Sequence, residues 1–468
     1  MRPLERFAAA LVLVAPVAAA QAEPQPYPAA EAQTLELTRE TIALRSVQGE
    51  DNRTPEVAQA YRRALLAAGW SDDDIEIVPV DDTAYLIATW PGSDPSLGPV
   101  VISAHMDVVE ARPEDWQRDP FTPVIENGYI YGRGASDTKF EASLAVASLI
   151  ELRRQGFQPR RSIVVAYSGD EETTMKTSKL IAERLRNAHI VLNVDGASGL
   201  ADEATGAPLY WTWQGAEKTY IDFRLEVTNP GGHSSAPRPD NAIAQLAQAV
   251  GRIAAYRFQP EINDVTRAYF EQVSAIQSNA GLAAAMRAFA ADPTDAAAIE
   301  RLRGDVVMNA VIGTTCVPTM IDGGHAPNAL PQRATAVINC RVFPGHDNAE
   351  IQAELERVAA TPEVTFTDIT GDTSTASPPS PLRPEFIDAF AKGVRAAWGD
   401  VPIYPAQSSG ASDSMWYRAL GVPSYGASAS FIKESDEFSH GLDERMPLSN
   451  IRPGITYYLT VLEELAAR

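Results

Sequence analysis

The chain has 468 residues, of which 45% are hydrophobic and 21% charged, a composition typical of a globular protein with two or three domains. Its formal net charge of −22 would repel a phosphate backbone, so we exclude nucleic-acid binding. Beyond the amino-terminal segment, no stretch reaches the roughly 18 consecutive apolar residues of a membrane-spanning helix.

The first 22 residues differ from the rest of the chain. Arg2 and Arg6 precede an apolar run from Phe7 to Ala20, and Ala20-Gln21-Ala22 has the small-residue pattern of a cleavage site. The run is shorter than the ~20 residues that span a bilayer. This favours a cleaved signal peptide (residues 1–22) over a membrane anchor, and predicts a secreted or periplasmic mature chain free of the membrane.

Residues 23–216 alternate predicted helices with apolar strands. The expected helices are 31–44, 55–68, 140–155 and 174–187, and the expected strands are 75–80, 85–90, 100–104, 162–167 and 190–194. This order predicts an α/β fold with a mostly parallel sheet flanked by helices. In such a sheet, ligands bind beyond the carboxyl ends of the strands.

From residue 217 the pattern changes, and residues 217–372 are expected to form a separate α+β domain. Predicted strands at 220–228, 308–321, 333–343 and 363–369, with helices at 241–256 and 348–359, give a βαββαβ order. The Ala-rich residues 262–304 read as a helical insertion. Residues 370–384 are rich in Ser, Thr and Pro and mark a hinge. Residues 373–468, with helices at 385–398 and 451–468, then complete the first domain.

The two cysteines, Cys316 and Cys340, each lie in an apolar, strand-like stretch. In an exported protein they could form a disulfide, and two buried free thiols fit the sequence equally well. Neither has the spacing of a zinc motif.

Acidic and imidazole side chains gather at the predicted strand ends and at glycine-rich turns. The five segments are Ser103–Asp107, Gly132–Lys139, Ser168–Glu172, Asn193–Gly196 and Ser439–Gly441. Clustered carboxylates repel one another and raise their own pKa values, a conflict that a divalent cation removes. His nitrogen with Asp and Glu oxygen suits zinc, with cobalt or manganese as alternatives. Five ligands with one shared carboxylate suit two ions ~3.5–4 Å apart.

Two acidic positions are suited to supporting roles. Asp107 lies two residues after His105 and faces the same way along an extended chain, so it could accept the second N–H of the imidazole and fix its tautomer. The pair Glu171-Glu172 allows a division of labour: one carboxylate binds metal, and the other takes a proton from the attacking water.

In their order along the chain, the five segments resemble the M20 family of metallopeptidases and amidohydrolases. The resemblance implies that His105 and Asp195 hold one zinc ion, that Glu172 and His440 hold the other, and that Asp137 bridges them. It also implies that Glu171 is the general base and that Asp107 supports His105.

The resemblance further implies that the smaller domain is a lid. Gly231-Gly232-His233-Ser234-Ser235 matches its signature, so His233 would polarise the scissile carbonyl, in dimeric members that of the partner subunit. A homodimer through the lid is therefore one expectation. Asn328 and Arg341 match lid positions that contact substrate, and an Arg fork suits a terminal carboxylate. Gly410 lies in a segment that resembles the substrate loop of the family.

Two features depart from the family pattern. Thr138 follows Asp137 where many members have a second acid, often after a cis peptide bond, and the 262–304 insertion enlarges the lid. The sequence has neither a G-x-S-x-G elbow nor a dinucleotide fingerprint. We therefore expect two-metal hydrolysis of a peptide or amide bond in small substrates with a free carboxylate. The alternatives are an N-acyl-amino-acid deacylase and an inactive exported binding protein.

Overall fold

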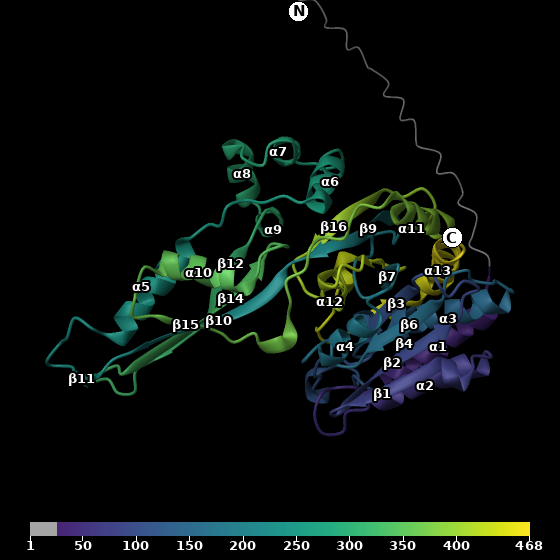
Figure 1. Ribbon diagram of the computed structural model, residues 1–468, viewed down its shortest axis with the longest axis horizontal. Coiled ribbons are helices and arrows are strands. Elements are labelled where there is room, and N and C mark those ends of the chain that lie inside the picture. Colours follow the sequence, from purple (N-terminus) through teal and green to yellow (C-terminus); the bar gives the residue numbers. More distant parts are fainter. Residues whose placement is uncertain (1–25) are drawn as a thin grey trace, which may run out of the picture.

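The computed structural model describes residues 26–468, so the predicted signal peptide lies outside the described residues. Two sheets divide most of the chain between them, and Figure 1 shows them side by side along the long axis of the molecule. Within the described residues, no helix combines the length and apolar character needed to cross a membrane.

The larger sheet has ten strands and is parallel at its centre. Antiparallel pairing joins β1, β2 and β6 at one edge, whereas β6, β3, β7 and β17 run parallel. In sheet order the strands are β1 (Ile75–Val80), β2 (Thr83–Trp90), β6 (Ile163–Ser168), β3 (Val100–His105), β7 (Ile190–Asn193), β17 (Ser424–Gly426), β9 (Pro208–Glu217), β8 (Gly199–Ala201) and β18 (Phe431–Ile432), with β16 (Ile403–Ser408) paired to β9.

Helices cover both faces of this sheet, as the alternation of its buried residues requires. Leu86 and Ala88 of β2 pack into one apolar core, and Tyr85 and Ile87 pack into another on the opposite face. The first core is completed by α1 (Pro28–Ile42), α2 (Thr54–Ala67), α3 (Phe140–Arg154), α11 (Pro384–Trp398) and α13 (Ile451–Ala466). The second is completed by α4 (Lys176–Arg184) and α12 (Ser414–Ala419). The α/β fold class is confirmed.

The smaller sheet has four antiparallel strands with α5 (Ala242–Ala255) and α10 (Asn348–Ala359) packed on one face. Its order is β12 (Thr315–Gly323), β14 (Arg333–Val342), β10 (Thr219–Thr228) and β15 (Thr365–Asp368). We call these six elements the small module. Their order along the chain is the expected βαββαβ. A short ribbon of β11 (Gly232–His233) and β13 (Ala329–Leu330) extends from it, and Figure 1 shows β11 at the end far from the larger sheet.

The Ala-rich insertion is helical, as expected, and has its own apolar core. It comprises α6 (Asp264–Val273), α7 (Ala280–Ala291), α8 (Ala296–Arg303) and α9 (Val306–Val311). The strand expected from Met308 was therefore wrong in its first part, because Asp305 accepts hydrogen bonds from the first turn of a helix there. The strand β12 begins only at Thr315.

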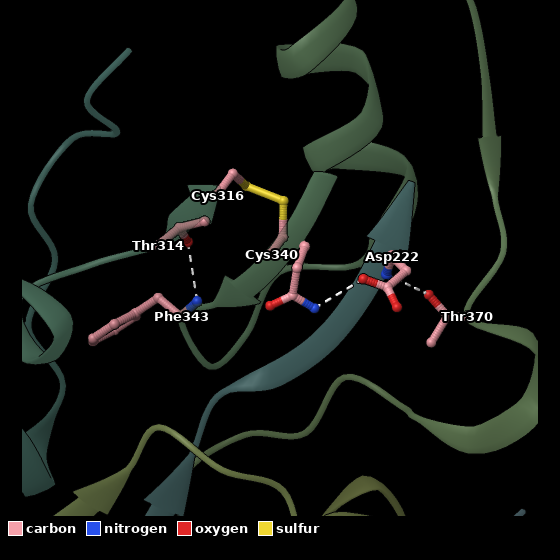
Figure 2. Close-up of a disulfide and its surroundings, with 7 residues drawn as sticks. Asp222, Thr314, Cys316, Cys340, Phe343 and Thr370 are labelled. Atoms are coloured by element: carbon pink, nitrogen blue, oxygen red, sulfur yellow. Dashed lines mark hydrogen bonds between the residues drawn. A yellow bond between two sulfur atoms is a disulfide. The ribbon is translucent and has the colours of Figure 1, made fainter. Parts of the chain in front are cut away.

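Cys316 and Cys340 are bonded to each other, which settles the alternative that the sequence left open. They are directly opposite residues on β12 and β14. Figure 2 shows the disulfide beside the hydrogen bond from the Phe343 backbone N–H to the Thr314 hydroxyl, so the start of β12 is fastened to the end of β14.

Candidate metal centre and substrate groups

The predicted metal ligands come together at the carboxyl ends of the central strands. His105 is the last residue of β3, Glu171 and Glu172 follow β6, and Asp195 follows β7. Because β6, β3 and β7 are parallel neighbours, their ends meet at one edge of the sheet. The loop before α3 brings Asp137 to the same edge, and the loop after β18 brings His440.

Asp137 lies between two groups of donors. Its Oδ1 is 2.8 Å from His105 Nε2, and its Oδ2 is 3.2 Å from His440 Nε2. On the far side of His105, Asp195 Oδ2 is 3.8 Å from the same Nε2. On the other side, Glu172 Oε1 is 3.0 Å from His440 Nε2. Donor atoms of His105, Asp137 and Asp195 thus form one triad, and those of Asp137, Glu172 and His440 form a second that shares Asp137. A third group joins His105, Glu171 and Glu172, so Glu171 also lies beside the ligands.

The electrostatics of these residues fit a pair of cations. Burial and the negative charges of Asp137 and Glu172 raise the pKa of Asp195 to about 7, against the opposing charge of His105. Burial, reinforced by nearby carboxylates, also raises the pKa of Glu171 well above its ordinary value. Hydrogen bonds to Asp137 and Glu172 raise the pKa of His440 to about 10. Divalent cations among these oxygens would relieve the repulsion between carboxylates, and the His, Asp and Glu donors suit zinc.

Asp107 is placed differently from the expectation. His105 Nδ1 lies 3.0 Å from the main-chain carbonyl of Asp107 and 3.7 Å from its carboxylate, so the carbonyl is the hydrogen-bond partner. The carboxylate instead accepts the backbone N–H groups of Glu171 and Glu172, at 3.1 and 3.0 Å. Asp107 therefore still fixes the imidazole with Nε2 toward the ligands, through its backbone, and its side chain orients the two glutamates.

Glu444 organises the loop that carries Asp137, a role that the sequence did not reveal. Its buried carboxylate accepts the backbone N–H groups of Gly134, Ser136 and Asp137 at 2.7–3.0 Å and pairs with Arg133 at 2.6 Å. The segment β19 (Arg445–Pro447) pairs with β5 (Tyr129–Tyr131) and brings Glu444 to this loop. The Asp137–Thr138 peptide bond is cis, although Thr138 replaces the acid common in the family.

The predicted substrate residues are not gathered at the metal ligands. Arg341 and the substrate loop meet where the two sheets join, and Arg341 Nη1 donates to the carbonyl of Ser409, next to Gly410, at 3.2 Å. His233 and Asn328 meet in the ribbon at the far end of the small module, where Ser234 N–H donates to the Asn328 carbonyl at 3.0 Å. His233 is exposed, and its Nδ1 lies 2.7 Å from the Ser235 hydroxyl. Within this chain, His233 therefore lies away from His105 and Asp137.

Comparison with known proteins identifies the family of this chain. The sequence profile described as peptidase family M20/M25/M40 matches residues 101–464, which is most of the chain. The chain belongs to this family. It is accordingly a hydrolase of the M20 type.

Individual members of the family are distant from this chain in sequence. It is 28% identical over 400 residues to probable carboxypeptidase S-like 2 of Dictyostelium discoideum, covering 81% of this chain and 74% of the relative. It is 26% identical to aminoacylase-1 of Sus scrofa, covering 93% and 95%. The M20 metallo-carboxypeptidase Sso-CP2 of Sulfolobus solfataricus has the same fold, with a TM-score of 0.67, 18% identity and coverage of 92% and 98%.

Proposed function

We propose that this enzyme uses two divalent metal ions to hydrolyse a peptide or amide bond next to a free carboxylate in small substrates. The observation that carries the proposal is the position of Asp137, with one carboxylate oxygen toward His105 and the other toward His440. His105 and Asp195 would hold one ion, Glu172 and His440 the other, and Asp137 both. Zinc fits these donors best, with cobalt or manganese as alternatives.

When bound, the ions supply a Lewis acid that polarises the scissile carbonyl and lowers the pKa of the attacking water. Glu171 takes the proton from that water. Its buried carboxylate groups with His105 and Glu172 but is absent from both triads that contain Asp137, which supports the role of base beside the ions. The same carboxyl group then gives the proton to the leaving amine. Asp107 keeps Glu171 in place through the backbone N–H.

The substrate carboxylate is assigned to the junction of the two sheets. Among residues 26–468, the Arg341 guanidinium donates only to the Ser409 carbonyl. Its other N–H groups are available to a carboxylate, which an Arg fork binds in two places. Gly410 lies beside this group, and its backbone N–H donates to the Ser408 hydroxyl at 2.9 Å. This geometry fits a carboxypeptidase or dipeptidase, in which the residue that leaves carries the free carboxylate.

An N-acyl-amino-acid deacylase is the second candidate. The same groups would bind the carboxylate of an acylated amino acid and break its amide bond. The similarity to an aminoacylase along 93% of the chain favours this reading. Aminoacylase is the relative's activity, and it comes to this chain as a hypothesis.

A panel of dipeptides and N-acyl amino acids tests both candidates. The metal-free enzyme is reconstituted with zinc, cobalt or manganese, and kcat/KM is measured for each substrate and for the same compounds with a carboxamide in place of the free carboxylate. We expect the enzyme to hydrolyse one class of substrate, with a kcat/KM at least about tenfold higher for the free acid than for the carboxamide. Failure to hydrolyse either class with any of the metals would contradict the proposal.

We also propose that the enzyme acts as a homodimer and is exported. His233 lies at the far end of the small module, so a second copy is needed to bring it to a metal centre as the family resemblance implies. The edge strand β12 offers an apolar surface for that copy, because Val317, Met320 and Ile321 are more than half exposed. Export rests on the predicted signal peptide and the disulfide.

A further inference from the structure

Lys218 is the one residue that separates β9 of the large sheet from β10 of the small module, and its side chain is buried. It follows the last residue of β9 and precedes the first residue of β10, and its backbone N–H donates to the Ser408 carbonyl at 3.0 Å. The residue is 1% exposed. Among residues 26–468, no acceptor lies within hydrogen-bond distance of its Nζ. A buried ammonium without a partner costs stability, so its presence calls for a partner that the folded chain does not supply.

A second cation lies on the same face of the small sheet. Tyr220 of β10 pairs with Arg341 of β14. Side chains alternate along a strand, so Lys218 shares its face with Tyr220 and Arg341, opposite to the core residue Ile221. The Arg341 guanidinium lies 4.7 Å from the centre of the Tyr220 ring and donates to the Ser409 carbonyl. In the described part of the chain, Arg341 forms no ion pair.

The acidic group that attracts Lys218 is already engaged. Glu261, which precedes α6, has a carboxylate oxygen 2.6 Å from His346 Nε2. Burial and the positive charge of Arg341 lower the pKa of Lys218 to about 8, with Glu261 opposing. Within the described residues, neither the Lys218 ammonium nor the Arg341 guanidinium forms an ion pair, although Glu261 and Asp222 lie near enough to act on them. Two cations without a direct carboxylate partner form an arrangement that attracts an anion.

We propose that Lys218 is a second cation of the substrate-carboxylate site, where its ammonium and Arg341 together bind the free carboxylate of the substrate. The inference rests on the proposed function and deepens it, because it makes Lys218 a residue that selects acids over neutral substrates. This role also places substrate binding at the residue where the chain passes from β9 of the large sheet to β10 of the small module. A bound carboxylate would provide the partner that the ammonium lacks.

The test compares two substrates that differ only in a terminal carboxylate or carboxamide. In Lys218→Met, we expect the ratio of kcat/KM for acid over amide to fall roughly 10- to 100-fold, the size of a lost hydrogen bond to a charged group. The loss should appear in KM for the acid, with the amide unaffected. Lys218→Arg, which keeps the charge, should retain most of the ratio. The control Lys392→Met removes a surface lysine paired with Glu464 and should leave the ratio unchanged.

The possible outcomes separate this inference from the proposed function. Equal losses for both substrates, or an unchanged ratio in Lys218→Met, would overturn the role of Lys218 while wild-type turnover still supports the function. If the wild-type enzyme hydrolyses neither substrate, the proposed function itself fails. Thermal unfolding controls for folding, and the melting temperature of Lys218→Met should be no lower than that of wild type. If Lys218→Met melts at a lower temperature, Lys218→Gln, which also removes the charge, is used for the same substrate comparison. Misfolding of both neutral variants would show a structural role and overturn the proposal.

Discussion

The metal centre and the junction with the small module handle charge in opposite ways. At the centre, Asp137 contacts both His105 and His440 directly, and carboxylates outnumber imidazoles in the cluster. At the junction, neither Lys218 nor Arg341 forms an ion pair with any residue of the described part of the chain. The comparison indicates a division of labour in which one sheet holds the chemistry and the small module holds the substrate. Under the proposed function, the acidic cluster would bind the metal ions, and the two unpaired cations would bind the substrate carboxylate.

Replacing Asp137 should have the largest effect, because it is the one carboxylate shared by both triads. Asp137→Ala should lose both ions and all measurable activity, whereas Asp195→Ala should keep more metal. Metal content by mass spectrometry and activity after reconstitution check this. A variant that retains both ions would break the proposed bridge.

Replacing Glu171 should separate chemistry from metal binding. Glu171→Ala should keep two ions and lose activity by roughly 10²- to 10⁴-fold, the usual contribution of a general base. Glu183→Ala, an exposed glutamate on α4, is the matched control and should behave as wild type. Retention of wild-type turnover by Glu171→Ala would refute its role, and loss of metal would make it a ligand.

Mixing two inactive variants tests whether the small module serves a second copy. His233→Ala alone should lose roughly 10²- to 10³-fold in kcat, the size of one lost oxyanion donor. After exchange of subunits with Glu171→Ala, about a quarter of wild-type activity should return, because in a two-fold dimer one site in each mixed dimer is intact. If the subunits are shown to exchange and the mixture is still as inactive as the two separate variants, His233 does not act in the partner's site.

The smallest effect concerns stability. The pKa of Lys218 is lowered to about 8 by burial and by Arg341, with Glu261 opposing, so at higher pH the unfolded chain binds more protons than the folded chain. The free energy of unfolding of wild type, relative to Lys218→Met, should therefore rise between pH 8 and about 10, by up to roughly 3 kcal/mol. Denaturant unfolding of both proteins at several pH values measures this. A constant difference would mean that Lys218 is not an unpaired buried cation.

The sequence predicted which candidate metal ligands come together because their positions follow local rules. Buried parallel strands can be recognised from apolar runs, and polar side chains directly after them must share one edge. His105 and Asp195 needed only that reasoning. Asp137 and His440 lie in loops, so their placement depended on the resemblance to a family.

The sequence did not reveal residues whose role depends on distant packing. Glu444 is one acid in an acidic run, and only the pairing of β19 with β5 brings its carboxylate to the Asp137 loop. The strand β16 was not predicted, and its pairing with β9 joins segments about 190 residues apart in the chain. Lys218 looks like an ordinary lysine between strands until its burial and its lack of an acceptor are seen.

The most direct test of the account is a crystal structure of the zinc-reconstituted enzyme, with anomalous diffraction measured at the zinc edge. We predict two peaks, one bonded to His105 and Asp195 and the other to Glu172 and His440, with Asp137 bonded to both and Glu171 bonded to neither. A single peak, or a peak bonded to Glu171, would contradict the two-ion centre and the assignment of its base.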